Sequence, residues 1–543
     1  MKTTVEIPKK AIKANGYVYI TTEKVYHKDK GYNVNRRMCI GKMTPDGKKM
    51  EPNNNYYRVF DKANAKPDAP KQSSTLLCGN KILIDNIVNN YGIRECLDDF
   101  EQESVDKMLD LATYMINKSS SSFQHFNSYA FNHMIFSKQP YTDVEISKFL
   151  TTDEYINKTI INQFLRNWAE RFVDKDEEIY VSYDSTNINI VSEGVTICEK
   201  GRAKDDSTRP QVNLEYAIRS KDGIPLTYES YPGSIIDMVQ CSKMVKSLAN
   251  LNYKNLTLVC DRGYISTENI RLMDKNKYNF ILLMKDNLKA SKWITKEYAA
   301  ELKDNYAHYI DEHDVYALTV TQDLFEMGKK RYFHLFFSEE LKLLEQKTLY
   351  ATIKNFNTEL ENDLESKKII NVAEYNRLLN YFDVELTKKH TVKSFSKNIE
   401  KINEKIATLG YYLLVSSKNI SAKEAYEAYH SRDIIEKTFR LIKSNLGSDT
   451  LGTETNNSTQ NKLFIIFLAT IILSYMKLQT KPLRQSNKKD FTLPAIINEL
   501  EKIESFYDPA LKEQVTRYKL TAKQKKIYAC FGIKENQLDD LIN

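Results

Sequence analysis

The sequence predicts an α/β fold in which a mixed sheet is flanked by helices and interrupted by an inserted subdomain. A small β-rich module and a helical domain precede this core. Three observations support the prediction. The hydrophobic pattern changes from helical to strand-like near residue 178, and strands and helices then alternate to about residue 287. A core-like strand, YYLLVSS, resumes only after a charged and irregular stretch that ends near residue 408.

Composition narrows the class of protein. The chain has 543 residues, of which 41% are hydrophobic and 28% charged, and this excludes a disordered chain. Seven scattered cysteines without C-x-x-C spacing argue against a disulfide scaffold or a zinc knuckle. The first residues lack the apolar segment of a secretory signal. The most apolar run, 463–475, is too short to span a bilayer and predicts a buried helix. We therefore expect a cytoplasmic protein with no membrane partner.

Residues 1–72 form a basic, β-rich N-terminal module. Alternating side chains from Tyr17 to Thr22 indicate a strand, and Pro45-Asp46-Gly47 indicates a turn. Residues 1–50 contain twelve Lys or Arg and four Asp or Glu, a net charge of +8 in a chain whose total is +7. Such a charge is typical of a module that binds a polyanion, and it is equally typical of a Lys-rich surface that only keeps a protein soluble. Charge alone leaves both interpretations open.

Residues 73–175 have the periodicity of helices. Thr142 and Glu145 form a capping box, and Ile160, Phe164 and Trp168 share one helical face. Two helices this close can form a DNA-reading helix-turn-helix or part of an ordinary bundle, and no recognition helix is identifiable. We interpret the region as a helical domain that binds DNA ends.

The core is divided into two parts. Residues 176–287 contain three strands, with an Asp222-Gly223 hairpin turn between the second and third, followed by alternating helices and strands. This is the order of a ribonuclease H-like core. Residues 288–408 are an insertion subdomain of strands and a long helix. Residues 409–480 complete the core with a strand and a long helix that begins at a capping box of Ser421 and Glu424 and ends with Gly447 as its C-cap. Residues 481–543 are a helical C-terminal region.

Three acidic residues stand out by context. Asp184 lies within the strand YVSYDST, Asp261 ends the strand LTLVCD, and Glu436 lies in the middle of the helix that follows Ser421. An Asp within a buried strand must be paired or bind a metal. If the three carboxylates converge, two Mg²⁺ ions would offset their repulsion and activate water for phosphodiester attack. Taken singly, each acid is better explained by an ordinary structural role: Asp184 as a turn residue, Asp261 as a helix N-cap and Glu436 as a surface charge.

The helix that carries Glu436 has a distinctive stripe. Tyr429, Arg432, Glu436 and Lys443 fall on one face with Arg440 beside them. Cations and an aromatic ring around one acid suit a surface that holds DNA through its phosphates. The alternative is an exposed helix stabilised by ion pairs four residues apart.

At these residues the sequence resembles a known family. The pattern Tyr429-x-x-Arg432-x-x-x-Glu436-x-x-x-x-x-x-Lys443 is similar to the Y-R-E-K signature of bacterial insertion-sequence DDE transposases. Asp184 in YDST and Asp261 in DRG look like the first and second catalytic aspartates of that family. The segment with Gly233 and Asp237 resembles the family's Gly-Asn-x-x-Asp segment, with Ser234 in place of Asn. The long gap before Glu436 fits the subgroup with an insertion.

The resemblance implies a function. It implies cut-and-paste DNA transposition, with Asp184, Asp261 and Glu436 as catalytic and metal-binding residues and Mg²⁺ as the metal, replaceable by Mn²⁺. Tyr429, Arg432, Arg440 and Lys443 would bind DNA. The implied partners are double-stranded DNA, as terminal inverted repeats and target, and a second copy of the chain in the synaptic complex. No phosphate-binding G-x-x-x-x-G-K-[ST] motif occurs, so no nucleotide cofactor is expected. Two alternatives stay open: another ribonuclease H-like nuclease or resolvase, and a non-catalytic DNA-binding protein derived from a transposase.

Overall fold

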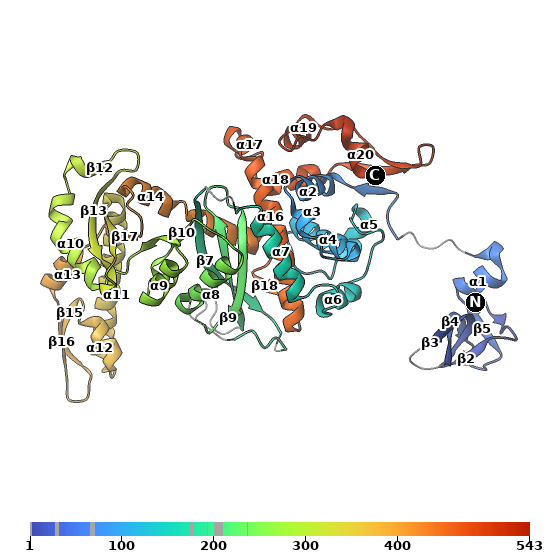
Figure 1. Cartoon of the computed structure of the whole chain (residues 1–543). Helices are drawn as coiled ribbons and strands as arrows, with labels where there is room; N and C mark the ends of the chain where they lie inside the picture. Colours follow the sequence, from blue (N-terminus) through green and yellow to red (C-terminus); the bar gives the residue numbers. More distant parts are fainter. Residues whose placement is uncertain are drawn as a thin grey trace. The chain divides into compact units, whose positions relative to one another are not determined.

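The computed structural model describes residues 3–27, 32–65, 71–173, 177–192, 194–199, 210–235 and 237–543. The chain divides into two compact units, Met1–Lys71 and Gln72–Asn543. Figure 1 shows the elements of both units.

The first unit is a small antiparallel sheet with one short helix. The strand order is β1-β5-β4-β3-β2, and a core of Val18, Ile40 and Met50 lies at its centre. Its elements are β1 (Val5–Glu6), β2 (Ile12–Ala14), β3 (Tyr17–His27), β4 (Tyr32–Met43), β5 (Lys49–Pro52) and α1 (Asn54–Phe60).

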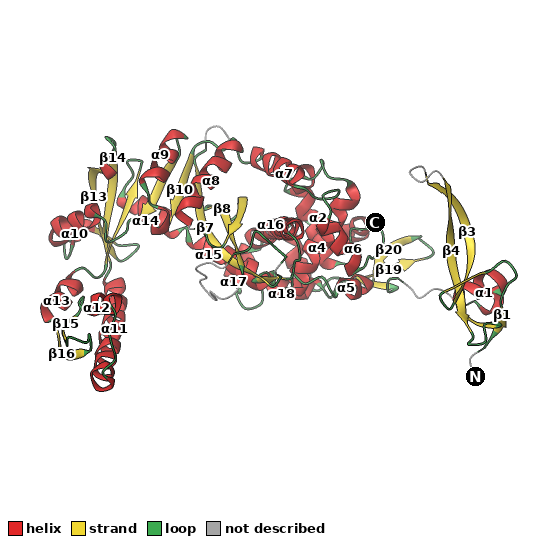
Figure 2. Ribbon diagram, turned by 90° about the horizontal axis from the view of Figure 1, so that it is seen from below, coloured by secondary structure: helices red, strands yellow, loops and turns green. Residues whose placement is uncertain are grey.

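A mixed sheet organises the second unit. Five of its strands run in the order β9-β8-β7-β10-β11; β7 pairs in parallel with β10 and β10 with β11, whereas the β7–β8 and β8–β9 pairs are antiparallel. Helices α8 and α9 cover one face and α14 and α15 the other (Figure 2). These elements are β7 (Ile179–Ile190), β8 (Gln211–Arg219), β9 (Pro225–Pro232), α8 (Asp237–Asn250), β10 (Leu256–Cys260), α9 (Thr267–Lys275), β11 (Asn279–Leu283), β17 (Tyr411–Ser416), α14 (Ala422–His430), α15 (Asp433–Arg440) and β18 (Thr450–Leu451).

The residues between β11 and β17 build two structures of different kinds. Strands β12 to β14 continue the core sheet, because β14 pairs with β17, which in turn pairs with β11. Helices α11 to α13 and the hairpin β15–β16 enclose a separate small hydrophobic core. The sequence predicts one insertion here; in the structure its first part is an extension of the main sheet. The elements are α10 (Lys289–Leu302), β12 (Tyr309–Ile310), β13 (Val315–Asp323), β14 (Lys330–Phe337), α11 (Glu339–Ser366), α12 (Val372–Leu378), β15 (Phe382–Leu386), β16 (Val392–Lys397) and α13 (Ile399–Ala407).

The helices that precede the sheet share a core with the helix that follows it. Helix α16 packs against α2, α4 and α6, and also against β9. The first group of elements is β6 (Thr75–Leu77), α2 (Gly79–Asn90), α3 (Ile93–Cys96), α4 (Gln102–Lys118), α5 (Phe126–Asn132), α6 (Asp143–Thr151) and α7 (Lys158–Glu170). The C-terminal group is α16 (Asn456–Gln479), α17 (Lys481–Ser486), α18 (Leu493–Leu500), β19 (Glu504–Asp508), β20 (Glu513–Thr516), α19 (Ala522–Ala529) and α20 (Leu538–Ile542).

Helix α16 is longer than the apolar run in the sequence. It has 24 residues because it continues through polar residues at both ends. The length of the apolar run, 463–475, is therefore no argument against a membrane span. It is the one helix in the described part of the chain that is long and apolar enough to cross a membrane, and 83% of its most apolar window is buried inside the protein. The predicted burial of residues 463–475 is confirmed.

The sequence predicts a helical C-terminal region over residues 481–543, but the structure has two strands within it. Strands β19 and β20 form an antiparallel hairpin, and β19 also pairs with β6 from the opposite end of the unit. Short strands of this kind carry little periodic signal. The pairing of β19 with β6 also joins residues more than 400 positions apart in the sequence.

Candidate active site

Two of the predicted acids meet because their strands are neighbours. Strands β7 and β10 are parallel, and their last paired residues are Tyr183 and Cys260. The residues that follow this pair are Asp184 and Asp261. The sheet therefore brings both aspartates to one position along the strands, about 4.8 Å apart in the hydrogen-bonding direction.

The third acid lies on helix α15, which packs against β7 and β8. The sequence predicts one helix from Ser421 to Gly447, and both ends are as expected: Ser421 and Glu424 form the capping box, and Gly447 has a positive φ of 57°. The helix is, however, divided between α14 and α15 at residues 431–432. Ser431 and Arg432 keep right-handed helical backbone angles, but hydrogen bonds three residues apart, such as the Arg432 amide to the Tyr429 carbonyl, replace the α-helical ones here. The Ser431 hydroxyl also donates a 2.6 Å hydrogen bond to the Ala428 carbonyl.

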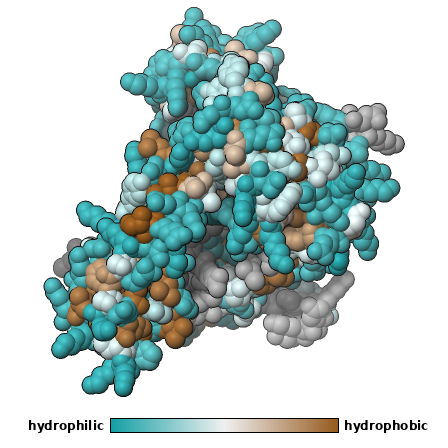
Figure 3. Space-filling model, turned by 90° about the vertical axis from the view of Figure 1, so that its left-hand side faces the viewer, coloured by the Kyte–Doolittle hydropathy of each residue, from teal (hydrophilic) through white to brown (hydrophobic). Residues whose placement is uncertain are grey.

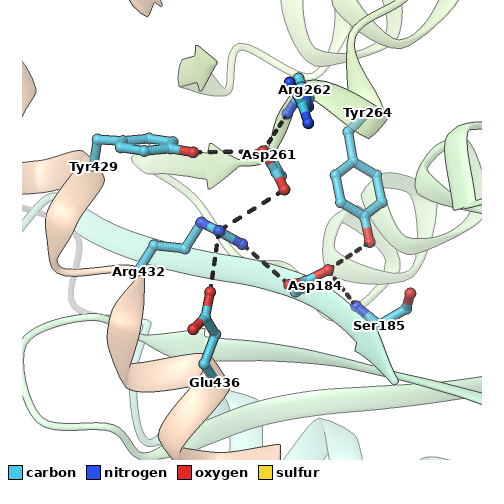
Figure 4. Close-up of polar contacts among 8 residues, drawn as sticks. All are labelled: Asp184, Ser185, Asp261, Arg262, Tyr264, Tyr429, Arg432 and Glu436. Atoms are coloured by element: carbon cyan, nitrogen blue, oxygen red, sulfur yellow. Dashed lines mark hydrogen bonds and ion pairs between the residues drawn. The ribbon is translucent and has the colours of Figure 1, made fainter. Parts of the chain in front are cut away.

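Arg432, at the junction of α14 and α15, lies between the acids. Its Nη1 lies 3.0 Å from Oδ2 of Asp184, and its Nη2 lies 3.4 Å from Oε1 of Glu436 and 3.9 Å from Oδ2 of Asp261. Figure 4 shows the three carboxylates pointing toward this one guanidinium. The structure thus brings together all three acids that the sequence singled out, around a cation from the same predicted stripe.

The centre of the site is shielded from solvent more than its rim. The side chains of Arg432 and Asp184 are 12% and 17% exposed, whereas Glu436 is 57% exposed. Burial acts to lower the pKa of the Arg432 guanidinium, but the electrostatic effects of Tyr429 and of the acids outweigh it and hold that pKa above its ordinary value. The four charged side chains sum to −2, so the site attracts a further cation.

Two tyrosines fix the orientation of the aspartates. The Tyr264 hydroxyl donates to Oδ1 of Asp184 at 3.1 Å, and the Ser185 amide donates to the same oxygen at 2.8 Å. The Tyr429 hydroxyl lies 3.5 Å from Oδ1 of Asp261. Burial, and to a smaller extent Asp261, raises the pKa of Tyr429. The hydroxyl therefore stays protonated and donates a hydrogen bond to Asp261.

Sequence reasoning missed Tyr264. It follows Asp261 by three residues in a single 3-10 turn, Arg262–Tyr264, for which Asp261 is the N-cap. The turn reverses the chain so that a buried tyrosine points back at the neighbouring strand. The only available signal was the aromatic residue after Arg262-Gly263.

The remaining residues of the predicted stripe lie further along. Arg440 is the last residue of α15, is exposed, and makes no hydrogen bond or ion pair within the described part of the chain. Lys443 lies in the π-helical turn Leu441–Asn445 that follows. Turns of this kind often occur at functional sites. Tyr429 and Arg432 of the stripe therefore contact the acids, whereas Arg440 and Lys443 lie further along the chain.

A cleft adjoins the site on the side of the insertion. Its volume is about 670 Å³, and its lining includes Arg262, Tyr429 and Tyr412 together with Leu343 and Leu344 of α11. The two leucines are 55% and 63% exposed. The end of this unit that carries the insertion faces the viewer in Figure 3, where hydrophobic side chains gather in separate patches on a hydrophilic surface. The cleft could hold a flat or apolar group beside the acids.

The acids have the right chemistry for a divalent cation. Carboxylate oxygens are the ligands that Mg²⁺ prefers, and the net charge of the site favours cation binding. Among the described residues, no three His, Cys, Asp or Glu side chains lie close enough to form a metal-binding group. Each acid instead lies within 4 Å of the same guanidinium, so they surround a space occupied by a cation of the protein itself.

Comparison with known proteins identifies a family for this part of the chain. A sequence model of the family described as Transposase DDE domain matches residues 177–472, more than half of the chain. The match begins two residues before β7 and ends within α16, and it includes all three acids. No curated protein matches the chain.

Proposed function

The chain belongs to the Transposase DDE domain family, and from this premise we propose that it is a catalytically active transposase for cut-and-paste transposition. It would cleave DNA at the ends of a transposable element and join them to target DNA. The proposed core is ribonuclease H-like, and the proposed subgroup is that of bacterial insertion-sequence enzymes with the Y-R-E-K signature. Its site of action would be the nucleoid in the bacterial cytoplasm.

The observation that carries the proposal is the convergence of Asp184, Asp261 and Glu436 on one cation. Three ionised groups repel each other, so a fold that gathers them from two strands and a helix must stabilise them by positive charge. The hydrogen bonds from Tyr264 and Ser185 hold Asp184 in this orientation. This convergence supports a functional role for the three acids.

We propose that these three carboxylates hold two Mg²⁺ ions, which Mn²⁺ could replace. Members of this family generally use divalent metal ions. When bound, they would lower the pKa of a water molecule and offset charge at the phosphate under attack. The three carboxylates would be the ligands, and Tyr429 would keep its proton and orient Asp261.

The cations of the stripe would hold the DNA. Arg432 has a planar donor set that suits a phosphate as well as a carboxylate, so it can exchange one for the other. Arg440 and Lys443 extend the positive charge along the same helix toward the following turn. DNA phosphates would then lie along this helix, with the scissile one beside the acids. A homodimer would bring two transposon ends together before strand transfer.

Conservative substitutions of the acids test the proposal. The variants Asp184→Asn and Glu436→Gln should lose Mg²⁺-dependent cleavage of duplex DNA taken from the flanks of the gene by about 10³-fold or more, since metal-assisted charge stabilisation is worth several kcal/mol. Binding of the same duplex, measured by electrophoretic mobility shift, should change little. Asp433→Asn is the matched control, because Asp433 is an exposed acid of the same helix that pairs with Lys437 instead.

Three outcomes would separate the candidates. Undiminished cleavage by both variants would refute the assignment of the acids. Binding without cleavage by the unaltered protein, with Mg²⁺ or Mn²⁺, would favour a non-catalytic DNA-binding protein. Cleavage confined to branched DNA, with linear ends left intact, would favour a resolvase.

A further inference from the structure

The hairpin β3–β4 extends well beyond the rest of the first unit (Figure 2). Strand β2 pairs with β3 only over Tyr17–Tyr19, and β5 pairs with β4 only over Gly41–Met43. Beyond the pair formed by Ile20 and Met38, each strand pairs only with the other in the described part of the chain. A two-stranded ribbon is marginal in water, so a partner that covers it would stabilise it.

The two faces of this ribbon differ in charge. On one face Glu23 pairs across the strands with Arg36, and their side chains form a 3.3 Å ion pair. The next pair outward is Lys24 with Asn35, and because side chains alternate along a strand it lies on the opposite face. Arg37 is two residues from Asn35 and shares that face.

The second face, which we call the donor face, consists of Lys24, Tyr26, Asn35 and Arg37. All four side chains are exposed, Tyr26 to 61%. In the described part of the chain, no hydrogen bond or ion pair involves the side chains of Lys24, Asn35 or Arg37. The face thus carries a charge of +2 and no acid, whereas the opposite pair is neutral.

We propose that the donor face binds double-stranded DNA with the ribbon lying in the major groove. The groove is about 12 Å wide and admits a two-stranded ribbon. Its base edges are read by Arg or Lys at guanine and by Asn at adenine, which are the residue types that the donor face presents. The choice of DNA rather than another polyanion rests on the proposed function, whereas the surface and its orientation rest on the ribbon alone.

The proposal assigns separate work to the two units. The ribbon provides contacts to base edges and therefore sequence preference, whereas the acids of the second unit act on phosphates, which carry no sequence information. Loss of the donor face should weaken recognition without changing the chemistry at the acids.

Arg37→Gln and Arg36→Gln form a matched pair for the test, because they remove the same charge from opposite faces of one ribbon. With the full-length protein and a duplex from the flanks of the gene, Arg37→Gln should weaken binding about 10-fold, measured by fluorescence anisotropy. Arg36→Gln should stay within about 2-fold of the unaltered protein. Asn35→Ala should reduce the ratio of affinities for this duplex and a shuffled duplex of equal length.

Equal losses in Arg36→Gln and Arg37→Gln, or none in either, would overturn the proposal, as would stronger binding of an RNA hairpin than of the duplex. If the unaltered protein binds the duplex but Arg37→Gln binds it equally well, only the ribbon is excluded. If the unaltered protein binds no duplex, the proposed function fails with it. Thermal unfolding of each variant excludes misfolding as the cause, since both side chains are exposed.

Discussion

The guanidinium of Arg432 lies where three carboxylates meet, and it cannot serve them and a DNA phosphate at the same time. With no DNA, its contacts with Asp184, Asp261 and Glu436 keep the acids together. A phosphate placed along α15 would compete for the same donors. Release of Arg432 would leave the acids with a charge of −3 and open to a divalent cation. DNA binding and metal binding should therefore favour each other.

Replacing Arg432 should uncouple the two events. In the absence of DNA, Arg432→Gln should bind Mn²⁺ about 10-fold more tightly than the unaltered protein, because a unit charge about 4 Å away is worth roughly 1–4 kcal/mol between water and a protein surface. Isothermal titration calorimetry measures this without any cleavage. Arg440→Gln removes the same charge from the same helix and should leave the affinity unchanged. Equal affinities for Arg432→Gln and the unaltered protein would contradict the competition.

The sequence predicts the members of the site better than their contacts. Asp184, Asp261 and Glu436 could be chosen because each lies at an unusual place in its own element. The contacts of Arg432 with Asp184 and Asp261 depend on how the helix that carries it packs against the sheet. Tyr264 depends on the direction of a three-residue turn. Tertiary geometry of this kind leaves no periodic trace in a sequence.

At the scale of elements, the helix that carries Glu436 is held at its far end by Gly447. A Cβ atom at this residue would lie 2.3 Å from the Ser119 carbonyl oxygen and 2.8 Å from the Ser120 Cα, both in backbone. The Gly447 carbonyl also accepts a hydrogen bond from the Ser121 hydroxyl at 2.8 Å. The segment after α4 therefore fixes where the helix that carries Glu436 ends. Sequence reasoning predicted the glycine as a helix cap but not its partner.

Gly447→Ala should therefore destabilise the second unit. Both the positive φ and the clash with backbone oppose a side chain here, and we expect a loss of about 2–4 kcal/mol in the free energy of unfolding. Urea denaturation followed by circular dichroism measures the loss. Gly452→Ala is the control, because nothing lies within 4 Å of a Cβ at that position and it should be nearly neutral. Similar free energies of unfolding for the two variants would mean that the close contact of Gly447 with Ser119 and Ser120 does not constrain this position.

At the scale of the whole molecule, the second unit is closed by contacts between its two ends. Strand β6 pairs with β19, and Lys118 and His133 both contact the carboxylate of Glu501 at the end of α18. The sequence predicted a helical domain and a helical tail as separate regions. The two regions are joined only by contacts between residues far apart in the sequence. These contacts could not be predicted, because β6 has only three residues and the residues around Glu501 form no recognisable sequence motif.

The cluster at Glu501 gives this closure a pH dependence. A hydrogen bond with His133, reinforced by Lys118, lowers the pKa of Glu501 from its ordinary 4.5 to about 2. A carboxylate with a lowered pKa contributes stability that is fully present above the unfolded value and is lost as the pH falls through the folded value. The contribution of Glu501 should thus be complete above about pH 5 and decline toward about pH 2.

Glu501→Gln should lower the free energy of unfolding at pH 7 by about 1–3 kcal/mol, because it removes the charge and leaves the Lys118 ammonium without its counter-ion. The gap between the variant and the unaltered protein should narrow in urea titrations at pH 5, 4 and 3. Glu385→Gln is the control, since its ion pair with Lys393 has both side chains 66% exposed, and it should leave stability nearly unchanged at every pH. A gap for Glu501→Gln that stays constant from pH 7 to pH 3 would show that the carboxylate charge does not hold the two ends of the unit together.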